Sequence, residues 1–325
     1  MPRHIPQKTL VAVAFTCVYF IWGSTYSAIH VAGLHLAPPL VGATRSLFST
    51  AIICGICLAR GVSLRVPFRT AWRLALVGIL MMTVNNLLLI WGETKVASGL
   101  SSLIIAMVPI FVAVIETVLP GGETLNLRGW LGTLLGAIGM FVLLWPALQT
   151  GETISGGRHI GGPDAHRLLG FVILIVAALA FAAGSVISRR FHFRVDAFVA
   201  TAWQIGAAGV VNLTIATAGG NFRTAHWTRS GLLAILYLST FGSVVGLTAY
   251  TYLLKHVPVT KVSTYAFVNP VIAVLIGVVT LHERPAPAEL TGMAIILVAV
   301  ATVILSRTKP APPPTNPMLE LPIEE

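Results

Sequence analysis

The chain contains an internal duplication, and this feature limits what it can fold into more than any other. The segment from Val96 to Leu119, VASGLSSLIIAMVPIFVAVIETVL, matches a later segment, VPVTKVSTYAFVNPVIAVLIGVVTL, at an offset of 161 residues. The residues that match at this offset are Ser102 with Ser263, Pro109 with Pro270, and Gly23-Ser24 with Gly184-Ser185. The chain therefore consists of two related halves.

Long apolar stretches fill both halves. Hydrophobic residues make up 56% of the 325 residues and charged residues only 10%, against about 25% charged residues in a soluble domain. A stretch of about 20 apolar residues is long enough to cross the hydrocarbon layer of a membrane. Such stretches lie near residues 10–30, 40–59, 72–92, 99–119, 129–147, 168–188, 197–218, 230–252, 260–281 and 287–306. The sequence thus predicts an all-α polytopic membrane protein with ten transmembrane helices.

Basic residues are distributed unevenly between the predicted loops. With an intracellular N-terminus, the loops on the same side carry most of the 21 lysines and arginines, including those at 65–73 and 189–194. Because positively charged loops stay on the cytoplasmic side, both termini are predicted to be cytoplasmic. This topological cause accounts for the formal charge of +10 without a nucleic-acid partner. An odd number of spans in each half also places the two halves in opposite orientations, as an inverted repeat.

Motifs near both ends of the chain carry a family resemblance. The first group comprises Trp22-Gly23-Ser24-Thr25-Tyr26, Ala28-Ile29, Val31-Ala32, Pro38-Pro39 and Arg45 within Ala43–Leu47. It resembles the opening signature of the EamA-type transporters in the drug/metabolite transporter superfamily. The second group, Tyr252 to Lys255, Asn269-Pro270 and Leu281 to Arg284, is similar to the closing motif of that family. This chain departs from the pattern at Ser46, where an aromatic residue is frequent, and at His282, where glycine is usual.

The resemblance implies two inverted five-helix repeats around a central cavity that opens alternately to the two sides of the membrane. The corresponding repeats are residues 1–147 and 168–306, joined by an external linker at 148–167. Residues 307–325 are proline-rich and are expected to form a disordered cytoplasmic tail. No cofactor and no metal is expected.

Each half carries a proline inside an apolar span, Pro109 or Pro270. Proline has no amide hydrogen and clashes with the carbonyl four residues earlier, so both helices are expected to kink. Interrupted helices at equivalent positions of two halves often mark a transport site. Simple structural kinks are the alternative, because prolines are frequent in membrane helices.

Arg45 is the most informative polar residue, because it lies inside the second predicted span. A charge in the middle of a membrane costs about 3 kcal/mol or more, so it should face the protein interior, water or a partner. We hypothesise that Arg45 attracts an anionic group of the substrate or orders the polar residues of the cavity. The alternative is that its side chain extends to the outer interface.

Amide side chains form the next candidate group. They are Asn85 and Asn86 in the third span, Gln204 in the seventh and Asn269 in the ninth. Asn85 and Asn86 are adjacent and point about 100° apart, so at most one should face the cavity squarely. Interhelical hydrogen bonds are the alternative role for this pair, and capping of the helix broken at Pro270 is the alternative for Asn269.

Aromatic side chains would suit a cavity that takes amphipathic organic molecules. The candidates are Trp22, Tyr26, Trp203, Tyr250 and Tyr265, together with Ser24 in the opening motif. Packing between helices is the alternative role of each aromatic residue.

Other reactive side chains suggest structural roles. Cys54 and Cys57 have the CxxC spacing but no second ligand pair, so buried apolar side chains are expected rather than metal or redox chemistry. Glu116 is expected at the inner interface, and Glu123 and Glu283 near helix N-termini. No carboxylate in mid-span stands out as a proton carrier, so ion coupling stays open.

The predicted function is secondary transport of small organic metabolites, with export of amino acids, amines or drug-like metabolites favoured. Exchange of sugar phosphates or nucleotide sugars is the alternative, although it would be expected to need more intramembrane basic residues than Arg45. An intramembrane enzyme is less favoured, because HExxH, GxSxG and Walker motifs are absent. The expected partners are a small-molecule substrate and the lipid bilayer of the plasma membrane, or of the inner membrane in a bacterium. A monomer is favoured.

Overall fold

The computed structural model describes residues 6–120, 125–149, 165–191, 193–257, 262, 265–282 and 285–306. All regular structure in these ranges is helical, which confirms the predicted all-α class. The helices of the first half are α1 (Gln7–Thr16), η1 (Cys17–Ile21), α2 (Trp22–Gly33), α3 (Pro38–Ala59), α4 (Phe68–Gly78), η2 (Ile79–Val84), α5 (Asn85–Glu93), α6 (Ser98–Ile105), α7 (Val108–Val118) and α8 (Leu127–Gln149). Those of the second half are α9 (Ala165–Phe191), α10 (Ala197–Ala218), α11 (Arg229–Tyr237), η3 (Leu238–Val245), α12 (Gly246–His256), α14 (Tyr265–Thr280) and α15 (Pro287–Ser306).

Within the described residues, seven helical segments are long and apolar enough to cross a membrane. They are Gln7–Gly33, Pro38–Ala59, Phe68–Glu93, Ser98–Val118, Ala165–Phe191, Ala197–Ala218 and Arg229–Leu253. The shorter apolar helices are Leu127–Leu143, Val268–Thr280 and Pro287–Val303. The apolar windows found in the sequence fall on these segments, because a chain in lipid must satisfy its backbone groups within each crossing.

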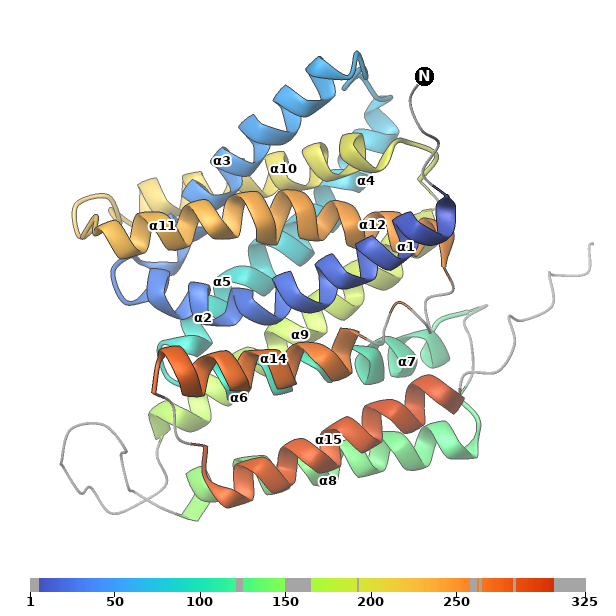
Figure 1. Ribbon diagram of the computed structural model, residues 1–325, viewed down its shortest axis with the longest axis vertical. Coiled ribbons are helices and arrows are strands. Elements are labelled where there is room, and N and C mark those ends of the chain that lie inside the picture. Colours follow the sequence, from blue (N-terminus) through green and yellow to red (C-terminus); the bar gives the residue numbers. More distant parts are fainter. Residues whose placement is uncertain are drawn as a thin grey trace, which may run out of the picture.

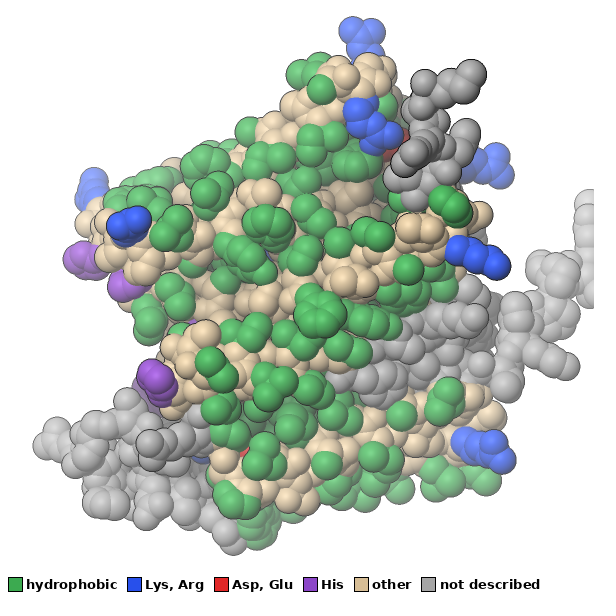
Figure 2. All heavy atoms as spheres, in the orientation of Figure 1, with side chains coloured by type: hydrophobic (Ala, Val, Ile, Leu, Met, Phe, Trp, Pro, Cys, Tyr) green, Lys and Arg blue, Asp and Glu red, His purple; other side chains and the backbone are tan. Residues whose placement is uncertain are grey.

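The helices lie side by side in one bundle, and α1 begins at the same end at which α15 finishes (Figure 1). On the face shown in Figure 2, hydrophobic side chains cover the middle of the bundle and basic side chains lie near helix ends. Large apolar side chains such as Phe20, Val210 and Val298 are more than half exposed in mid-helix. Such a surface is suited to contact with lipid.

Glycines bring α8 and α15 into close contact at one side of the bundle. A Cβ added to Gly132 would lie 2.8 Å from Val303 Cγ2, and one added to Gly292 would lie 2.7 Å from the Leu143 nitrogen. Small residues at such positions let helix backbones approach where lipid supplies no hydrophobic drive. The small-residue faces of these two helices therefore meet within one chain.

His282 adopts a backbone conformation that favours glycine. It follows the end of α14 and has a φ of 56°, in the left-handed region. Glycine adopts this conformation freely, whereas a side chain makes it less favourable. A left-handed residue after a helix is a common C-terminal cap.

Several expectations concern residues outside the described part of the chain. They are Ser263, Glu123, Glu283, the tail 307–325 and residues 150–164 of the linker. The remaining linker positions, 148, 149 and 165–167, belong to the ends of α8 and α9.

Candidate functional site

A small pocket, which we call the central pocket, lies among helices of both halves. Its cavity volume is about 70 Å³, which is room for a few water molecules but not for a metabolite. Its lining residues are Trp22, Thr25, Tyr26, Ile29, Arg45, Met82, Asn85, Asn86, Leu89, Ile105, Phe181, Gly242, Leu247, Tyr265 and Asn269. The sequence-predicted site residues among them are Trp22, Tyr26, Arg45, Asn85, Asn86, Tyr265 and Asn269.

Arg45 is buried in the wall of the central pocket, with only 8% of its surface exposed. Its Nε donates to Ser243 Oγ at 2.7 Å and its Nη1 donates to Asn86 Oδ1 at 3.3 Å. Both acceptors are neutral, and within the described ranges Arg45 forms no ion pair. The guanidinium therefore points into the bundle, and an anionic group in the pocket would be stabilised beside it.

π-helical turns in two equivalent spans position the partners of Arg45. Residues 79–84 of η2 correspond to 240–245 at the 161-residue offset, which lie within η3. Ser243 belongs to η3, and Asn86 lies in the first turn after η2. π-helical turns are rare in proteins, and those that occur often lie at functional sites. The duplication therefore includes a pair of equivalent π-helical turns, η2 and η3, which place the two hydrogen-bond partners of Arg45.

Asn85 and Asn86 both line the central pocket, although only one was expected to face it. Asn85 Nδ2 donates to the Ala177 carbonyl of α9 at 2.9 Å, whereas Asn86 accepts from Arg45 and donates to the Met82 carbonyl at 3.2 Å. Directions 100° apart are compatible with one pocket because its wall includes Phe181 of α9 as well as Arg45 of α3. Both side chains also make the hydrogen bonds that the alternative interpretation required.

Aromatic rings close one side of the central pocket. Trp22 lies 5.0 Å from Tyr250, 5.5 Å from Tyr265 and 6.3 Å from Phe181 between ring centroids. The Trp22 indole N–H donates to the Gly242 carbonyl at 3.1 Å. A Cβ on Gly246 would lie 2.4 Å from Trp22 Nε1, so glycine is required for this approach. We call these four aromatic residues the aromatic partition.

A second, larger pocket lies beyond the aromatic partition. Its volume is about 580 Å³, within the range of small-molecule sites. The lining residues are Met81, Ser185, Ser188, Arg189, Phe193, Arg194, Val195, Ala197, Ala200, Gln204, Leu247, Tyr250 and Thr251. We call it the arginine pocket. Gln204 and Tyr250, expected in one cavity with Arg45, line this pocket instead, and Leu247 borders both.

Ser24 and Trp203 lie outside both pockets. Ser24 Oγ donates to the Ile21 carbonyl at 2.8 Å and lies 2.5 Å from the Tyr237 hydroxyl. Trp203 is 37% exposed, and its indole N–H donates to the Leu64 carbonyl at 2.9 Å. Trp203 and Gln204 are consecutive in α10, so their side chains point to different faces and only Gln204 faces inward.

The two prolines occupy different local structures. Turn residues 106 and 107 separate α6 from α7, and Pro109 lies in the first turn of α7. Pro270 instead lies inside the continuous helix α14. Asn269 is 3% exposed. Its side-chain amide is oriented so that the nitrogen donates to the carbonyl of Tyr19 at 3.0 Å and to that of Tyr265 at 3.3 Å.

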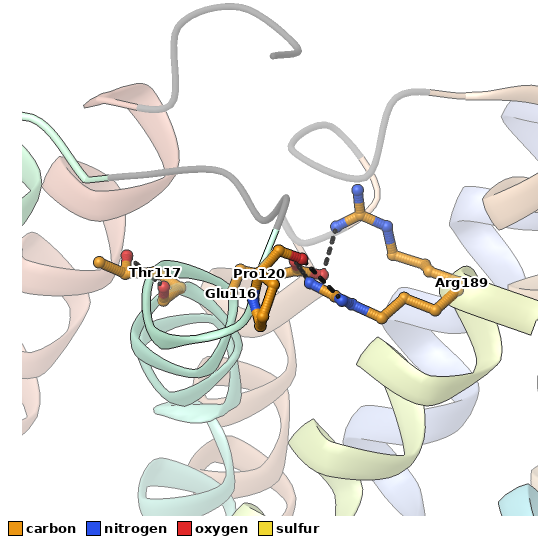
Figure 3. Close-up of polar contacts among 6 residues, drawn as sticks. Glu116, Thr117, Pro120 and Arg189 are labelled. Carbon is orange, nitrogen blue, oxygen red and sulfur yellow. Dashed lines mark hydrogen bonds and ion pairs between the residues drawn. The ribbon is translucent and has the colours of Figure 1, made fainter. Parts of the chain in front are cut away.

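Glu116 links two helices at the end of the bundle where α1 begins. It is only 5% exposed at the end of α7. Arg189 and Arg190 of α9 reach it at 3.5 Å and 3.2 Å, and Arg190 also donates to the Pro120 carbonyl at 3.2 Å (Figure 3). Glu116 therefore forms a buried ionic connection between the two halves, while its position at the inner membrane interface stays a prediction.

Sequence reasoning missed the apolar part of the central pocket. Phe181, Met82, Leu89 and Leu247 line it but look like ordinary core residues in the sequence. Phe181 alone carried a signal, since it lies three residues before the repeated Gly184-Ser185 motif.

Metal binding has no support in the described part of the chain, where no group of three or more His, Cys, Asp or Glu residues could hold an ion. Cys54 and Cys57 are free thiols in α3.

The chain matches the model of the EamA-like transporter family twice, at residues 9–145 and 168–305. It is 33% identical to the uncharacterized inner membrane transporter YedA of Escherichia coli K12, over 94% of this chain and 95% of that protein. It is 25% identical to the uncharacterized transporter YvbV of Bacillus subtilis, over 94% of each chain. A known crystal structure superposes on 93% of this chain and 99% of its own with a TM-score of 0.63 at 22% identity, which shows a shared fold. Two family matches that together span most of the sequence, each containing one half of the duplication, establish that the chain belongs to the EamA-like transporter family.

Proposed function

We propose that this protein is a secondary transporter that exports small organic metabolites, such as amino acids, amines or drug-like molecules, by alternating access. The observation that carries the proposal is the buried Arg45, which faces a pocket built from both halves and whose hydrogen-bond partners in the described part of the chain are the neutral Ser243 and Asn86. A site shared by two repeats can open to either side when one repeat rocks against the other.

The size of the central pocket supports a closed state of such a cycle. About 70 Å³ cannot hold a metabolite, whereas the arginine pocket on the far side of the aromatic partition has about 580 Å³. Movement of the aromatic partition would join the two spaces. The path would then lead from one end of the bundle to Arg45.

The proposal includes ten membrane spans as two inverted repeats, residues 1–147 and 168–306, in a monomer of the plasma or bacterial inner membrane. The shorter apolar helices in α8, α14 and α15 support the remaining spans. The shared end of α1 and α15 in Figure 1 supports termini on one side, and the basic loops favour the cytoplasm. A green fluorescent protein fused after residue 325 should fluoresce, since it folds in the cytoplasm.

Counterflow in proteoliposomes tests the transport function. Vesicles loaded with unlabelled amino acids, amines and sugar phosphates are assayed for uptake of each labelled compound. Wild type should take up one class, Arg45→Met should lose that uptake, and Arg223→Met, which changes an exposed loop arginine, should retain it. Uptake of sugar phosphates alone would favour the exchanger alternative. Absence of uptake by correctly folded protein would refute the proposal.

A further inference from the structure

The wall of the arginine pocket carries polar side chains that substrate binding at Arg45 would not require. Arg189 and Arg194 supply two guanidinium groups, and Ser185, Ser188 and Thr251 supply hydroxyl groups. Among the residues that the structure describes, those that line the pocket include no aspartate or glutamate. Guanidinium and hydroxyl donors together match the oxygen atoms of a carboxylate or a phosphate.

Charged groups of both signs lie close to the pocket. The Glu116 carboxylate pairs with Arg189 and Arg190. Asp196 precedes α10, where its carboxylate accepts from the Phe198 amide at 2.8 Å and caps the helix. Arg194 contributes an exposed guanidinium group to the pocket wall.

A helix N-terminus also borders the pocket. Ala197 and Ala200 of the first turn of α10 line it. The amide groups at the start of a helix carry partial positive charge, which the capping carboxylate of Asp196 offsets in part. Arg189 and Arg194 are therefore the main cationic groups at this cavity of metabolite size.

The position of the pocket relates it to Arg45. Leu247 borders both pockets, and Tyr250 contributes to the arginine pocket while its ring lies 5.0 Å from that of Trp22 in the aromatic partition. An anion held at Arg189 and Arg194 would therefore lie next to the partition that closes the Arg45 site.

We propose that the arginine pocket is a second binding site, which holds the oxyanion group of a small organic anion or zwitterion before it passes to Arg45. This inference rests on the proposed transport function and narrows its substrates to molecules that carry a carboxylate or phosphate. Simple amines are excluded. The aromatic partition would receive the apolar body of the substrate.

Thiol protection tests the site without transport. Ser188 is replaced by cysteine in full-length protein whose Cys17, Cys54 and Cys57 are alanine, and labelling by N-ethylmaleimide is timed in detergent. Phenylacetate, phenyl phosphate and phenethylamine serve as probes, because they share a ring and differ in charged group. Ser230→Cys, exposed at the start of α11 at the opposite end of the bundle, is the control.

Phenylacetate or phenyl phosphate should slow labelling of Ser188→Cys about tenfold when present at ten times its dissociation constant. The more effective anion identifies the group as carboxylate or phosphate. Phenethylamine should not protect, and neither anion should protect Ser230→Cys. Adding Arg194→Gln should raise the dissociation constant of the anion by about tenfold or more, the value of one charge-assisted hydrogen bond, so that protection at the same concentration falls to about twofold or less. Arg45→Met should leave the protection in place.

Equal protection by the amine and the anions, or none by any probe, would overturn the inference. If Arg194→Gln does not fold, the comparison of probe charges alone still decides the question. Protection without counterflow would refute transport and keep the site. Counterflow without protection would keep transport and refute the site.

Discussion

Replacing Arg45 by methionine is expected to reduce transport by about tenfold or more while changing the stability of the protein by no more than about 2 kcal/mol. The side chain is 8% exposed, and both of its hydrogen-bond partners, Ser243 and Asn86, are neutral. Among the described residues, no carboxylate forms an ion pair with this buried charge. This arrangement favours function over stability.

The structure allows the two opposing terms to be estimated. Burial of an ion costs several kcal/mol after relaxation, and the substitution removes this cost. Loss of two hydrogen bonds from a charged donor costs about 1.5–3 kcal/mol each. Methionine fills most of the space of the arginine stem, so no large cavity forms. The terms nearly cancel, and the net change should lie within about 2 kcal/mol in either direction.

Thermal unfolding in detergent and counterflow in proteoliposomes measure the two effects separately. A change of 2 kcal/mol corresponds to a melting shift below about 8 °C, whereas loss of the charge-assisted bond to substrate should reduce uptake by about tenfold to a hundredfold. Arg223→Met is the matched control for the loss of one arginine. A strongly destabilised Arg45→Met protein with normal uptake per folded molecule would refute the reasoning.

Four further single substitutions and one charge exchange test individual contacts. Glu116→Gln should lower stability by about 1–3 kcal/mol, since it breaks a buried carboxylate's pairing with partly exposed arginines. In thermal unfolding, the double variant with Glu116→Lys and Arg190→Glu should be more stable than Glu116→Lys alone. Gly78→Ala should cost about 1–3 kcal/mol or more, because its Cβ would lie 2.2 Å from a backbone oxygen of α10. Gly55→Ala, with no atom within 4 Å of the new Cβ, should instead raise the melting temperature slightly. His282→Gly should stabilise by about 1 kcal/mol, since φ is 56° there, and an unchanged or lower melting temperature would contradict that explanation.

The positions of the helices could be predicted closely from the sequence. The window 197–218 coincides with α10 and 287–306 with α15, while the window 260–281 compares with Tyr265–Thr280 for α14. Apolar length identifies such segments because backbone groups in lipid must bond within the segment. The π-helical turns η2 and η3 leave no signal in composition, since they depend on one extra residue in a turn.

The candidate site could be predicted only in part. Arg45 and Trp22 were identified because a charge or a conspicuous motif inside an apolar span needs an explanation. The separation of Gln204 from Arg45 into another pocket was not predicted, because similar depth in two repeats does not specify direction across the bundle. Trp203 and Gln204 show the same limit within one helix, where neighbours face opposite environments.

The sequence by itself determined the all-helical membrane class, the duplication and the family, because apolar length and repeated motifs are properties of the chain in one dimension. Only the tertiary structure decided how each helix is rotated about its axis and how closely its neighbours approach. Those two quantities follow from contacts between residues far apart in sequence, such as Trp22 with Gly246 and Arg45 with Ser243. They place the aromatic partition between two pockets and direct a buried arginine into one of them.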